Sequence, residues 1–306
     1  MNKTGICLFS SYFNGSTLPY YVAYYVIELK RHFDKVLFIT NSKSDGNWKE
    51  SLRVLEVEVM QVDNEGFDFG MWYKAMLKID LPSWKEIALV NDSCILFRPI
   101  DEDMSKIRNM SDEYVGMVLS DRYKRHLQSY FIVAKGKAVP LMSSYFLEHG
   151  IVPDYREVIQ TYEIGLSDFM RQNEVKVTSL YNRGFESYPK NPSFARIEAL
   201  IEEGIPMIKK KIIYRNFRGL EYYWVIRMNF STRYKKYIRL IRMKYGESNI
   251  IDFDKVMSEA PRKGSGDIWL METGRFLANG LRMIPGATWL FRKSVQWYKS
   301  FNTQTK

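Results

Sequence analysis

Four short runs rich in Val, Ile, Leu and Phe alternate with helical segments in the first third of this chain, and this alternation limits the folds open to it. The four runs span residues 5–11, 35–41, 55–62 and 86–92. The intervening segments, which repeat apolar residues at helical spacing, span residues 18–33, 47–55 and 69–79. Strands connected through helices lie parallel in one sheet, with helices on both faces. The pattern predicts an α/β fold with a mostly parallel sheet, whose ligands bind at the carboxyl ends of the strands.

The rest of the chain divides into further strands and helices and then a basic, aromatic region. We expect strands in residues 113–121, 127–136 and 175–181, and helices in residues 139–149, 154–172 and 192–203. After Pro206 the sequence becomes basic and aromatic. Two parts are predicted: an α/β domain over residues 1–205 and a basic helical extension over residues 206–306.

The formal net charge of +10 is concentrated in one segment. Between Lys209 and Lys244 there are twelve Lys or Arg residues and one acidic residue, Glu221, so the rest of the chain is nearly neutral. A nucleic-acid-binding protein more often spreads positive charge over the domain that faces the nucleic acid. We therefore expect no nucleic acid partner and keep nucleic acid binding by the basic segment as an alternative.

The cysteines and the N-terminal sequence bear on the compartment. Cys7 and Cys94 are the two cysteines of the chain, and both lie in apolar runs, so neither a disulfide framework nor a cysteine zinc site is expected. The uncharged stretch 5–27 is interrupted by Asn14 and Pro19, which argues against a signal peptide or a membrane span. A reducing cytoplasm fits these features best.

Acidic residues follow the third and fourth predicted strands. Asp68 lies in NEGFDFG and Asp92 lies in NDS. The chain has neither GxGxxG nor GxxxxGK[ST], the sequences that cradle phosphates in dinucleotide-binding and P-loop proteins. A carboxylate after the fourth strand, often in a D-x-D sequence, is typical of GT-A nucleotide-sugar transferases, where it holds a divalent cation against the leaving diphosphate. Both acids are therefore expected to line one donor site.

Several longer motifs occur in order along the chain and resemble a known family. They run from about residue 5 to residue 213 and are FSSYFNGSTLPYYVAYYVIELK, FITNS, NEGFDFGMWYKA, LVNDSCIL, HLQSYFIVAKGKA, YEIGLS and NPSFARIEALIEEGIPMIKKKI. Together they resemble the rhamnan synthesis protein F family of bacterial cell-surface polysaccharide glycosyltransferases. The resemblance implies a GT-A-like enzyme that transfers a sugar, rhamnose in the name-giving members, from a nucleotide diphosphate donor to a growing lipid-linked glycan. A catalytically inactive glycan-assembly scaffold is an alternative.

The residues assigned to the nucleotide-sugar donor are Ser10, Asp68, Asn91, Asp92 and Ser93. Asp68 is expected to contact the base or ribose, with a helix cap as the alternative. Asp92 ends a very apolar run, where a carboxylate is costly without a cation, a partner or solvent, and it is the predicted ligand of Mg²⁺ or Mn²⁺. Because NDS lacks one carboxylate of D-x-D, metal dependence stays open, and positive side chains are the alternative partner of the diphosphate.

His126, Gln128 and Glu163 are assigned to the sugar side of the site. His126 and Gln128 lie in the HLQSYF motif and are predicted to hydrogen-bond the donor or acceptor sugar. An inverting transfer needs a base for the acceptor hydroxyl, and the resemblance at YEIGLS favours Glu163 over Asp168, which would point in a different direction on a helix. The alternatives are that Glu163 caps or salt-bridges its own helix, and that a retaining mechanism needs no base.

The basic extension is predicted to bind an anionic membrane surface. Its segment YKKYIRLIRMKY, residues 234–245, has apolar residues at helical spacing among cations, and Trp269, Trp289 and Trp297 follow it. A lipid-linked acceptor would be presented at such a surface, so the expected location is the inner face of the cell membrane, without a span. Packing of these helices on the α/β domain is the alternative.

Overall fold

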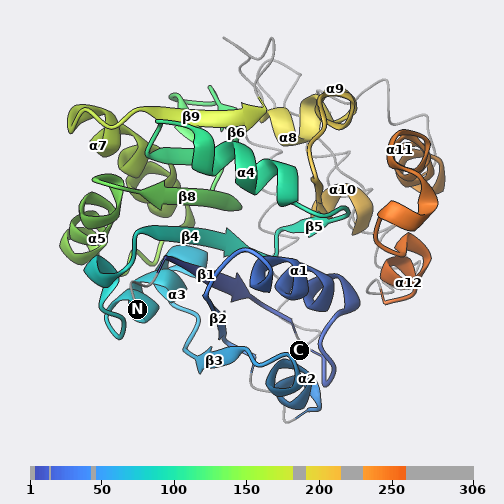
Figure 1. The fold of residues 1–306 in the computed structure, drawn as a ribbon, viewed down its shortest axis with the longest axis horizontal. Coiled ribbons are helices and arrows are strands. Elements are labelled where there is room, and N and C mark those ends of the chain that lie inside the picture. The colour runs from blue at the N-terminus through green and yellow to red at the C-terminus, as the bar shows by residue number, and fades with distance from the viewer. Residues whose placement is uncertain (1–3, 14, 43–45, 182–190, 215–229, 260–306) are drawn as a thin grey trace, which may run out of the picture. The chain divides into compact units, whose positions relative to one another are not determined.

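The computed structural model describes residues 4–13, 15–42, 46–181, 191–214 and 230–259. Its main sheet has the strand order β3-β2-β1-β4-β8-β6-β7, and β9 also pairs with β6 (Figure 1). The strands of this sheet are β1 Gly5–Ser11, β2 Lys35–Thr40, β3 Glu58–Gln61, β4 Glu86–Asn91, β6 Tyr114–Ser120, β7 His126–Leu127, β8 Phe131–Lys135 and β9 Val177–Tyr181. All of them except β7 fall inside segments predicted to be strands.

The sheet is mostly parallel, as the alternation of strands and helices predicts. β1 pairs in parallel with β2 and β4, β2 with β3, and β6 with β9. β8 is reversed and runs antiparallel to β4 on one side and to β6 on the other. The predicted fold class, an α/β fold with a mostly parallel sheet flanked by helices, is confirmed.

Helices cover both faces of the sheet because alternate residues of its central strands point in opposite directions. The described helices are α1 Tyr20–Lys30, α2 Trp48–Val54, α3 Phe67–Met76, η1 Leu81–Ser83, α4 Asp101–Asn109, α5 Ala138–His149, α6 Tyr155–Val158, η2 Ile159–Gly165, α7 Leu166–Gln172, α8 Pro192–Ala195, α9 Ile197–Glu203, α10 Lys210–Tyr214, α11 Phe230–Tyr245, η4 Glu247–Asn249 and α12 Phe253–Ser258. Phe9 of β1 packs in one core with α1, α2 and α4, whereas Leu8 packs in another with α3, α5 and α7. Burial on both faces explains the nearly continuous apolar strands.

The helix predicted over residues 154–172 is broken by a π-helical segment. The segment η2 lies between α6 and α7 and carries Glu163. Gly165 ends it at a point of close approach, since a Cβ there would lie 2.4 Å from the Tyr145 hydroxyl oxygen. That hydroxyl donates a hydrogen bond to the Thr161 carbonyl at 2.6 Å. Segments of π-helix are rare and are frequent at functional sites.

A second, two-stranded sheet was not predicted from the sequence. It joins β5 (Cys94–Leu96) to β10 (Met207–Lys209) in antiparallel register, with Lys209 opposite Cys94. The pairing draws the start of the predicted basic extension onto the segment that follows β4. Residues 207–209 are therefore part of the same packed unit as the main sheet.

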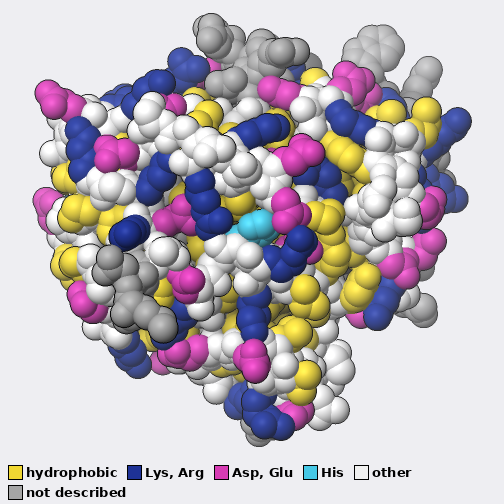
Figure 2. Space-filling view, viewed as in Figure 1, with side chains coloured by type: hydrophobic (Ala, Val, Ile, Leu, Met, Phe, Trp, Pro, Cys, Tyr) yellow, Lys and Arg dark blue, Asp and Glu magenta, His cyan; other side chains and the backbone are white. Residues whose placement is uncertain are grey.

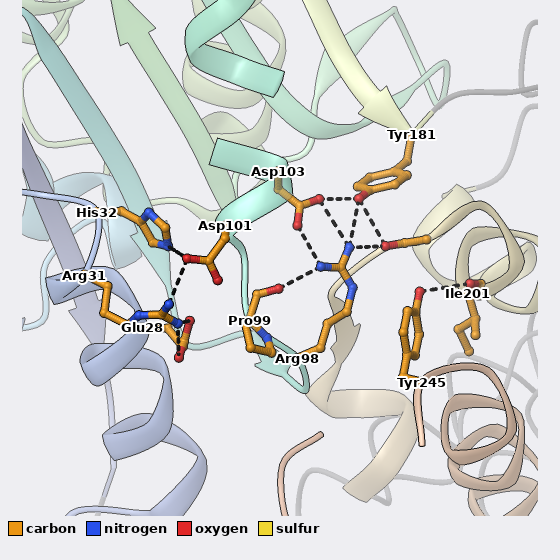
Figure 3. A network of polar contacts seen from close by, with 11 residues as sticks. Glu28, Arg31, His32, Arg98, Pro99, Asp101, Asp103, Tyr181, Ile201 and Tyr245 are labelled. Carbon is orange, nitrogen blue, oxygen red and sulfur yellow. Dashed lines mark hydrogen bonds and ion pairs between the residues drawn. The ribbon is translucent and has the colours of Figure 1, made fainter. Parts of the chain in front are cut away.

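Arg98 fixes the turn that precedes β10 (Figure 3). Its guanidinium donates to Asp103 Oδ2 at 3.0 Å, to the Tyr181 hydroxyl at 3.3 Å and to the Gly204 carbonyl. The Tyr181 hydroxyl also donates to the carboxylate of Asp103, which is fully buried. The network ties α4, β9 and the turn after α9 together, so it sets where β10 begins.

The described part of α11 packs against the rest of the protein through its apolar side. Ile238 and Ile241 are buried in the core that also contains α9. Lys236 Nζ lies 2.7 Å from Glu198 Oε1 on α9, and Arg242 Nη2 lies 3.2 Å from Asp254 Oδ2. The described part of α11 therefore packs on the α/β unit, as in the alternative to membrane binding. Trp269, Trp289 and Trp297 lie outside the described residues.

The chain separates into two compact units, Met1–Glu259 and Ala260–Lys306. The second unit lies outside the described residues, and the predicted division at residue 206 stays a prediction. In the part of the chain that is described, every helix is too short or too polar to span a membrane.

Candidate functional site

The carboxyl ends of β1 and β4 lie side by side because the two strands pair in parallel, with Ser10 opposite Asn91. The backbone N–H of Asp92 donates to the Ser10 carbonyl at 3.2 Å. Asp68, on α3, reaches the same edge, where it accepts hydrogen bonds from Ser10 Oγ at 3.0 Å and from Asn91 Nδ2 at 2.9 Å. The structure thus brings together the two acids that the sequence singles out.

The backbone just before Asp68 has an unusual conformation. Gly66 and Phe67 have φ angles of 75° and 59°, and a left-handed conformation is costly for a residue such as Phe67. The Phe67 ring meets the Tyr155 ring edge-on, with 5.5 Å between the ring centres. Asp68 lies in the first turn of α3, but its described side-chain hydrogen bonds go to β1 and β4. These contacts favour a role at the strand ends over the helix cap.

The surroundings of Asp68 raise its pKa to about 6. Burial is the largest cause, and the negative charge of Asp92 is the second. The hydrogen bond from Ser10 and the positive charges of Lys209 and Lys210 lower the pKa and so limit this rise. Carboxyl groups that titrate near neutral pH are concentrated at functional sites.

Asp92 is buried, with 8% of its surface exposed, and is held by three donors. Its Oδ2 accepts hydrogen bonds from Ser11 Oγ at 3.1 Å, from the Tyr21 hydroxyl at 3.2 Å and from Lys210 Nζ at 2.9 Å. A carboxylate in so apolar a place needs such partners. The partner cation in the described structure is therefore a lysine of the same chain.

Lys209 and Lys210 complete this edge, although sequence reasoning did not assign them to the site. The backbone N–H of Lys210 donates to the Ser93 carbonyl at 2.9 Å. Lys209 Nζ lies 3.5 Å from Ser93 Oγ and 4.3 Å from the centre of the Tyr130 ring. The apolar residues 205–208 could have indicated them, because they predict a short strand that ends at the two lysines. The Asp92 cluster is defined as Ser10, Ser11, Tyr21, Asp68, Asn91, Asp92, Ser93, Lys209 and Lys210.

Glu163 faces the loop between β7 and β8. Ser129 Oγ donates to Glu163 Oε1 at 2.7 Å, and His126 Nε2 lies 3.8 Å from Glu163 Oε2. The side chain of Glu163 is 24% exposed, so its carboxylate retains access to solvent. These contacts reach outside its own helical segment, unlike a cap or a local salt bridge. Asp168 Oδ1 lies 2.8 Å from Arg171 Nη1 of its own helix, and Asp168 Oδ2 lies 2.5 Å from Lys124 Nζ in the loop before β7, so both of its oxygens are paired with cations.

His126 and Gln128 are buried, and their polar atoms are hydrogen-bonded within the protein. His126 Nδ1 lies 2.6 Å from the Lys124 carbonyl oxygen, which only accepts, so Nδ1 carries a proton. Gln128 Nε2 lies 3.3 Å from His126 Nε2, and Asn191 Nδ2 donates to Gln128 Oε1 at 2.7 Å. These hydrogen bonds fix the imidazole of His126 beside Glu163. Direct contact of His126 or Gln128 with a sugar stays a prediction. Asn191 was not assigned from the sequence.

Tyr130 joins the two sets of residues. Its carbonyl accepts a hydrogen bond from the Asn91 N–H at 3.2 Å, and its hydroxyl lies 3.2 Å from Ser193 Oγ of α8. The preceding residue, Ser129, binds Glu163. The Glu163 cluster is defined as His126, Gln128, Ser129, Glu163 and Asn191. Both clusters therefore belong to one polar edge at the end of β4 and the start of β8.

The residues around Asp92 do not fit a divalent cation held as in D-x-D. Mg²⁺ and Mn²⁺ need several oxygen ligands, normally including carboxylates. Asp92 Oδ2 already accepts three hydrogen bonds, one of them from the ammonium group of Lys210. The other acid of the cluster, Asp68, is held by Ser10 and Asn91.

Within the described residues, one group of acids and a histidine has the spacing of metal ligands: Glu28, His32 and Asp101 (Figure 3). Arg31 already bridges both acids, since its guanidinium donates to Glu28 at 3.0 and 3.1 Å and to Asp101 at 2.9 Å. The group also lies at the opposite end of α1 from Tyr21, which contacts Asp92. It is therefore separate from the cation site that the sequence predicts at Asp92.

The fold and this edge define a class: an α/β protein with a mostly parallel sheet and acids near the carboxyl ends of its parallel strands β1 and β4. The chain belongs to the rhamnan synthesis protein F family, which matches residues 36–265, three quarters of its length. The match confirms the resemblance carried by the motifs. No curated protein matches the chain.

Solved structures resemble the chain only weakly. A cytidylyltransferase from Leptospira borgpetersenii is 13% identical, with a TM-score of 0.40, and the alignment covers 86% of this chain and 100% of that one. Glucosyl-3-phosphoglycerate synthase from Mycobacterium tuberculosis, in complex with Mn²⁺ and UDP-glucose, is 11% identical, with a TM-score of 0.41, over 67% of this chain and 80% of that one.

Proposed function

We propose that this protein is a glycosyltransferase that uses a nucleotide-sugar donor in the synthesis of a cell-surface polysaccharide. The observation that carries the proposal is the convergence of two carboxylates and two lysines at the carboxyl ends of β1 and β4, namely Asp68, Asp92, Lys209 and Lys210. Ammonium groups suit a diphosphate, and a carboxylate suits the hydroxyls of a ribose or sugar. Membership in the rhamnan synthesis protein F family supports a role in polysaccharide synthesis.

In the proposed reaction, the acceptor hydroxyl oxygen forms a bond to the anomeric carbon of the donor sugar, and the bond from that carbon to the diphosphate oxygen breaks. The electron pair of the broken bond stays on the nucleoside diphosphate. The hydroxyl proton passes to Glu163, which acts as the base of an inverting transfer. Glu163 suits this role because its carboxylate is partly exposed and is oriented by Ser129.

The finer parts of the proposal follow from the same residues and from the family. Asp68 contacts the nucleoside, while Ser10 and Asn91 hold its carboxylate in place. His126 and Gln128 orient the sugar side of the edge. The donor sugar is rhamnose or a related hexose, and the acceptor is a lipid-linked glycan presented at the inner face of the membrane.

The first prediction separates donor binding from catalysis. Titration calorimetry of the full chain with UDP, dTDP and GDP sugars is expected to show binding that depends on the base. Glu163→Gln preserves size and hydrogen bonding but removes basicity, so turnover should fall by about 10²- to 10⁴-fold with donor affinity nearly unchanged. Asp168→Asn, a matched change on the adjoining helix, should leave turnover near that of the wild type.

Two outcomes contradict parts of this proposal. If no nucleotide sugar binds and none is consumed, the catalytically inactive scaffold is the better description. If nucleotide sugars bind and Glu163→Gln keeps most of its turnover with the correct acceptor, the transferase stands but Glu163 is not its base.

A further inference from the structure

The cation that faces Asp92 is a lysine distant in the sequence. Lys210 Nζ lies 2.9 Å from both Asp92 Oδ2 and the Tyr21 hydroxyl oxygen. Lys209, the preceding residue, places its Nζ beside the hydroxyl of Ser93 at 3.5 Å. Both lysines therefore lie where the sequence predicts a metal ion held by the carboxylate that follows the fourth strand.

We propose that Lys210, assisted by Lys209, neutralises the diphosphate of the donor in place of a divalent cation, and that Asp92 positions Lys210 instead of ligating metal. The proposal rests on the proposed glycosyltransferase function and names the groups that bind the leaving diphosphate. It accounts for the departure from D-x-D, because a single carboxylate is enough to orient an ammonium group but provides few ligands for Mg²⁺.

The geometry of Lys210 suits this role. An ammonium group has three N–H donors, and the contacts to Asp92 and Tyr21 use two of them. The side chain of Lys210 is 25% exposed, so it is accessible from solvent, whereas that of Asp92 is 11% exposed. The third N–H is thus the one assigned to a phosphate oxygen.

Backbone pairing fixes the position of this lysine. The N–H of Lys210 donates to the Ser93 carbonyl at 2.9 Å, and Lys209 is opposite Cys94 in the antiparallel pair of β10 and β5. Residues 93 and 94 directly follow Asp92 in the chain. The pairing of β5 with β10 therefore fixes the position of the Lys210 ammonium group relative to the Asp92 carboxylate. Such preorganisation is what charge stabilisation requires.

The chemical step needs only charge stabilisation from this group. When the bond between the anomeric carbon and the diphosphate oxygen breaks, its electron pair remains on that oxygen. The protonated amines of Lys210 and Lys209 stabilise the negative charge that develops there. Both lysines stay protonated throughout, and the acceptor proton goes to Glu163.

The test compares diphosphate and monophosphate binding in the full-length protein, with UDP, dTDP, GDP and their monophosphates as probes in titration calorimetry. The wild type is expected to bind its preferred diphosphate equally well in EDTA and in Mg²⁺ or Mn²⁺. Lys210→Met should weaken diphosphate binding by about 10- to 100-fold, as expected for the loss of a charge-assisted hydrogen bond. It should weaken monophosphate binding less, and Lys210→Arg should restore part of the loss.

Control variants address folding and general charge. Lys210→Met combined with Asp92→Asn removes the unpaired buried carboxylate and should still bind diphosphate weakly. Lys236→Met on α11 breaks an exposed ion pair with Glu198 of α9 and should bind like the wild type. Circular dichroism and Tm establish that each variant is folded.

Three results would overturn the inference. Diphosphate binding by the wild type that disappears in EDTA and returns with Mn²⁺ would show a metal site, and an unchanged affinity in folded Lys210→Met would show that this lysine does not bind the diphosphate. Either result leaves nucleotide binding, and so the proposed function, intact. Failure of the wild type to bind any of the probes with or without metal would overturn both proposals together.

Discussion

At the scale of single residues, the position of Asp68 at the edge of the sheet changes the pKa of its carboxyl group. Burial and the nearby charge of Asp92 raise its pKa to about 6, well above the usual range of an aspartate. The folded protein therefore binds this proton more tightly than the unfolded chain does. By linkage, Asp68 contributes stability that is fully present below about pH 4 and is lost as the pH rises through about 6.

The second prediction is that Asp68→Asn removes this pH dependence. The free energy of unfolding of the variant, minus that of the wild type, should increase between pH 4 and pH 7 and then level off. Because Asp68 is only partly buried, we expect the total change to be below about 3 kcal/mol. Urea unfolding at a series of pH values measures it. Parallel stability curves for the two proteins over this range would contradict the assignment.

At the scale of elements, the pair β5 and β10 matters most for the site because it carries Lys209 and Lys210 to Asp92. The turn before β10 is held by Arg98, whose side chain is 12% exposed and pairs with the fully buried Asp103 (Figure 3). Breaking a buried ion pair by removing one partner leaves an uncompensated charge. The Arg98 network is therefore expected to support both stability and the placement of the lysines.

The third prediction concerns this network. Arg98→Met should lower the free energy of unfolding by about 3–5 kcal/mol, and it should weaken nucleoside diphosphate binding because the start of β10 loses its anchor. Arg53→Met is the control, since Arg53 pairs with Glu50 at 2.6 Å and both side chains are largely exposed, at 77% and 57%; its effect should be markedly smaller. Equal stability of the two variants in urea would show that Arg98 is not an anchor.

At the scale of the whole molecule, the positive charge that is concentrated in the sequence is partly paired in the structure. Acidic and basic side chains are interspersed on the face shown in Figure 2. On α11 the apolar side is buried, and cations such as Lys236 and Arg242 pair with acids. For the described part of this helix, membrane contact would therefore depend on its exposed cations rather than on an apolar face.

The fourth prediction tests the proposed membrane attachment. Flotation with liposomes should show binding that requires anionic lipid and decreases as salt rises, because each Lys or Arg near such a surface contributes about 1 kcal/mol. Lys235→Glu with Arg239→Glu, two exposed positions of α11, should weaken binding, whereas Lys49→Glu on α2 should not. Equal binding to neutral vesicles, or none, counts against the proposal.

The sequence by itself determined most strands of the main sheet and the two acids near its edge. Both depend on local patterns: apolar strands alternate with helices, Asp92 ends the fourth predicted strand, and Asp68 lies shortly after the third. Parallel pairing then requires neighbouring strand ends to meet, as Ser10 and Asn91 do. The family motifs also singled out Glu163, which lies beside Ser129 and His126.

Only the tertiary structure decided which groups surround those acids. Lys210 contacts Asp92 across 118 residues of sequence, through a strand pair that no local pattern specifies. The π-helical segment that carries Glu163 ends at Gly165, whose close approach to Tyr145 is a contact that helical periodicity cannot predict. Local sequence fixes which elements form, because propensity and apolar spacing act over a few residues. The partner of each buried charge is fixed by long-range packing, because only the folded chain brings those groups within hydrogen-bonding distance.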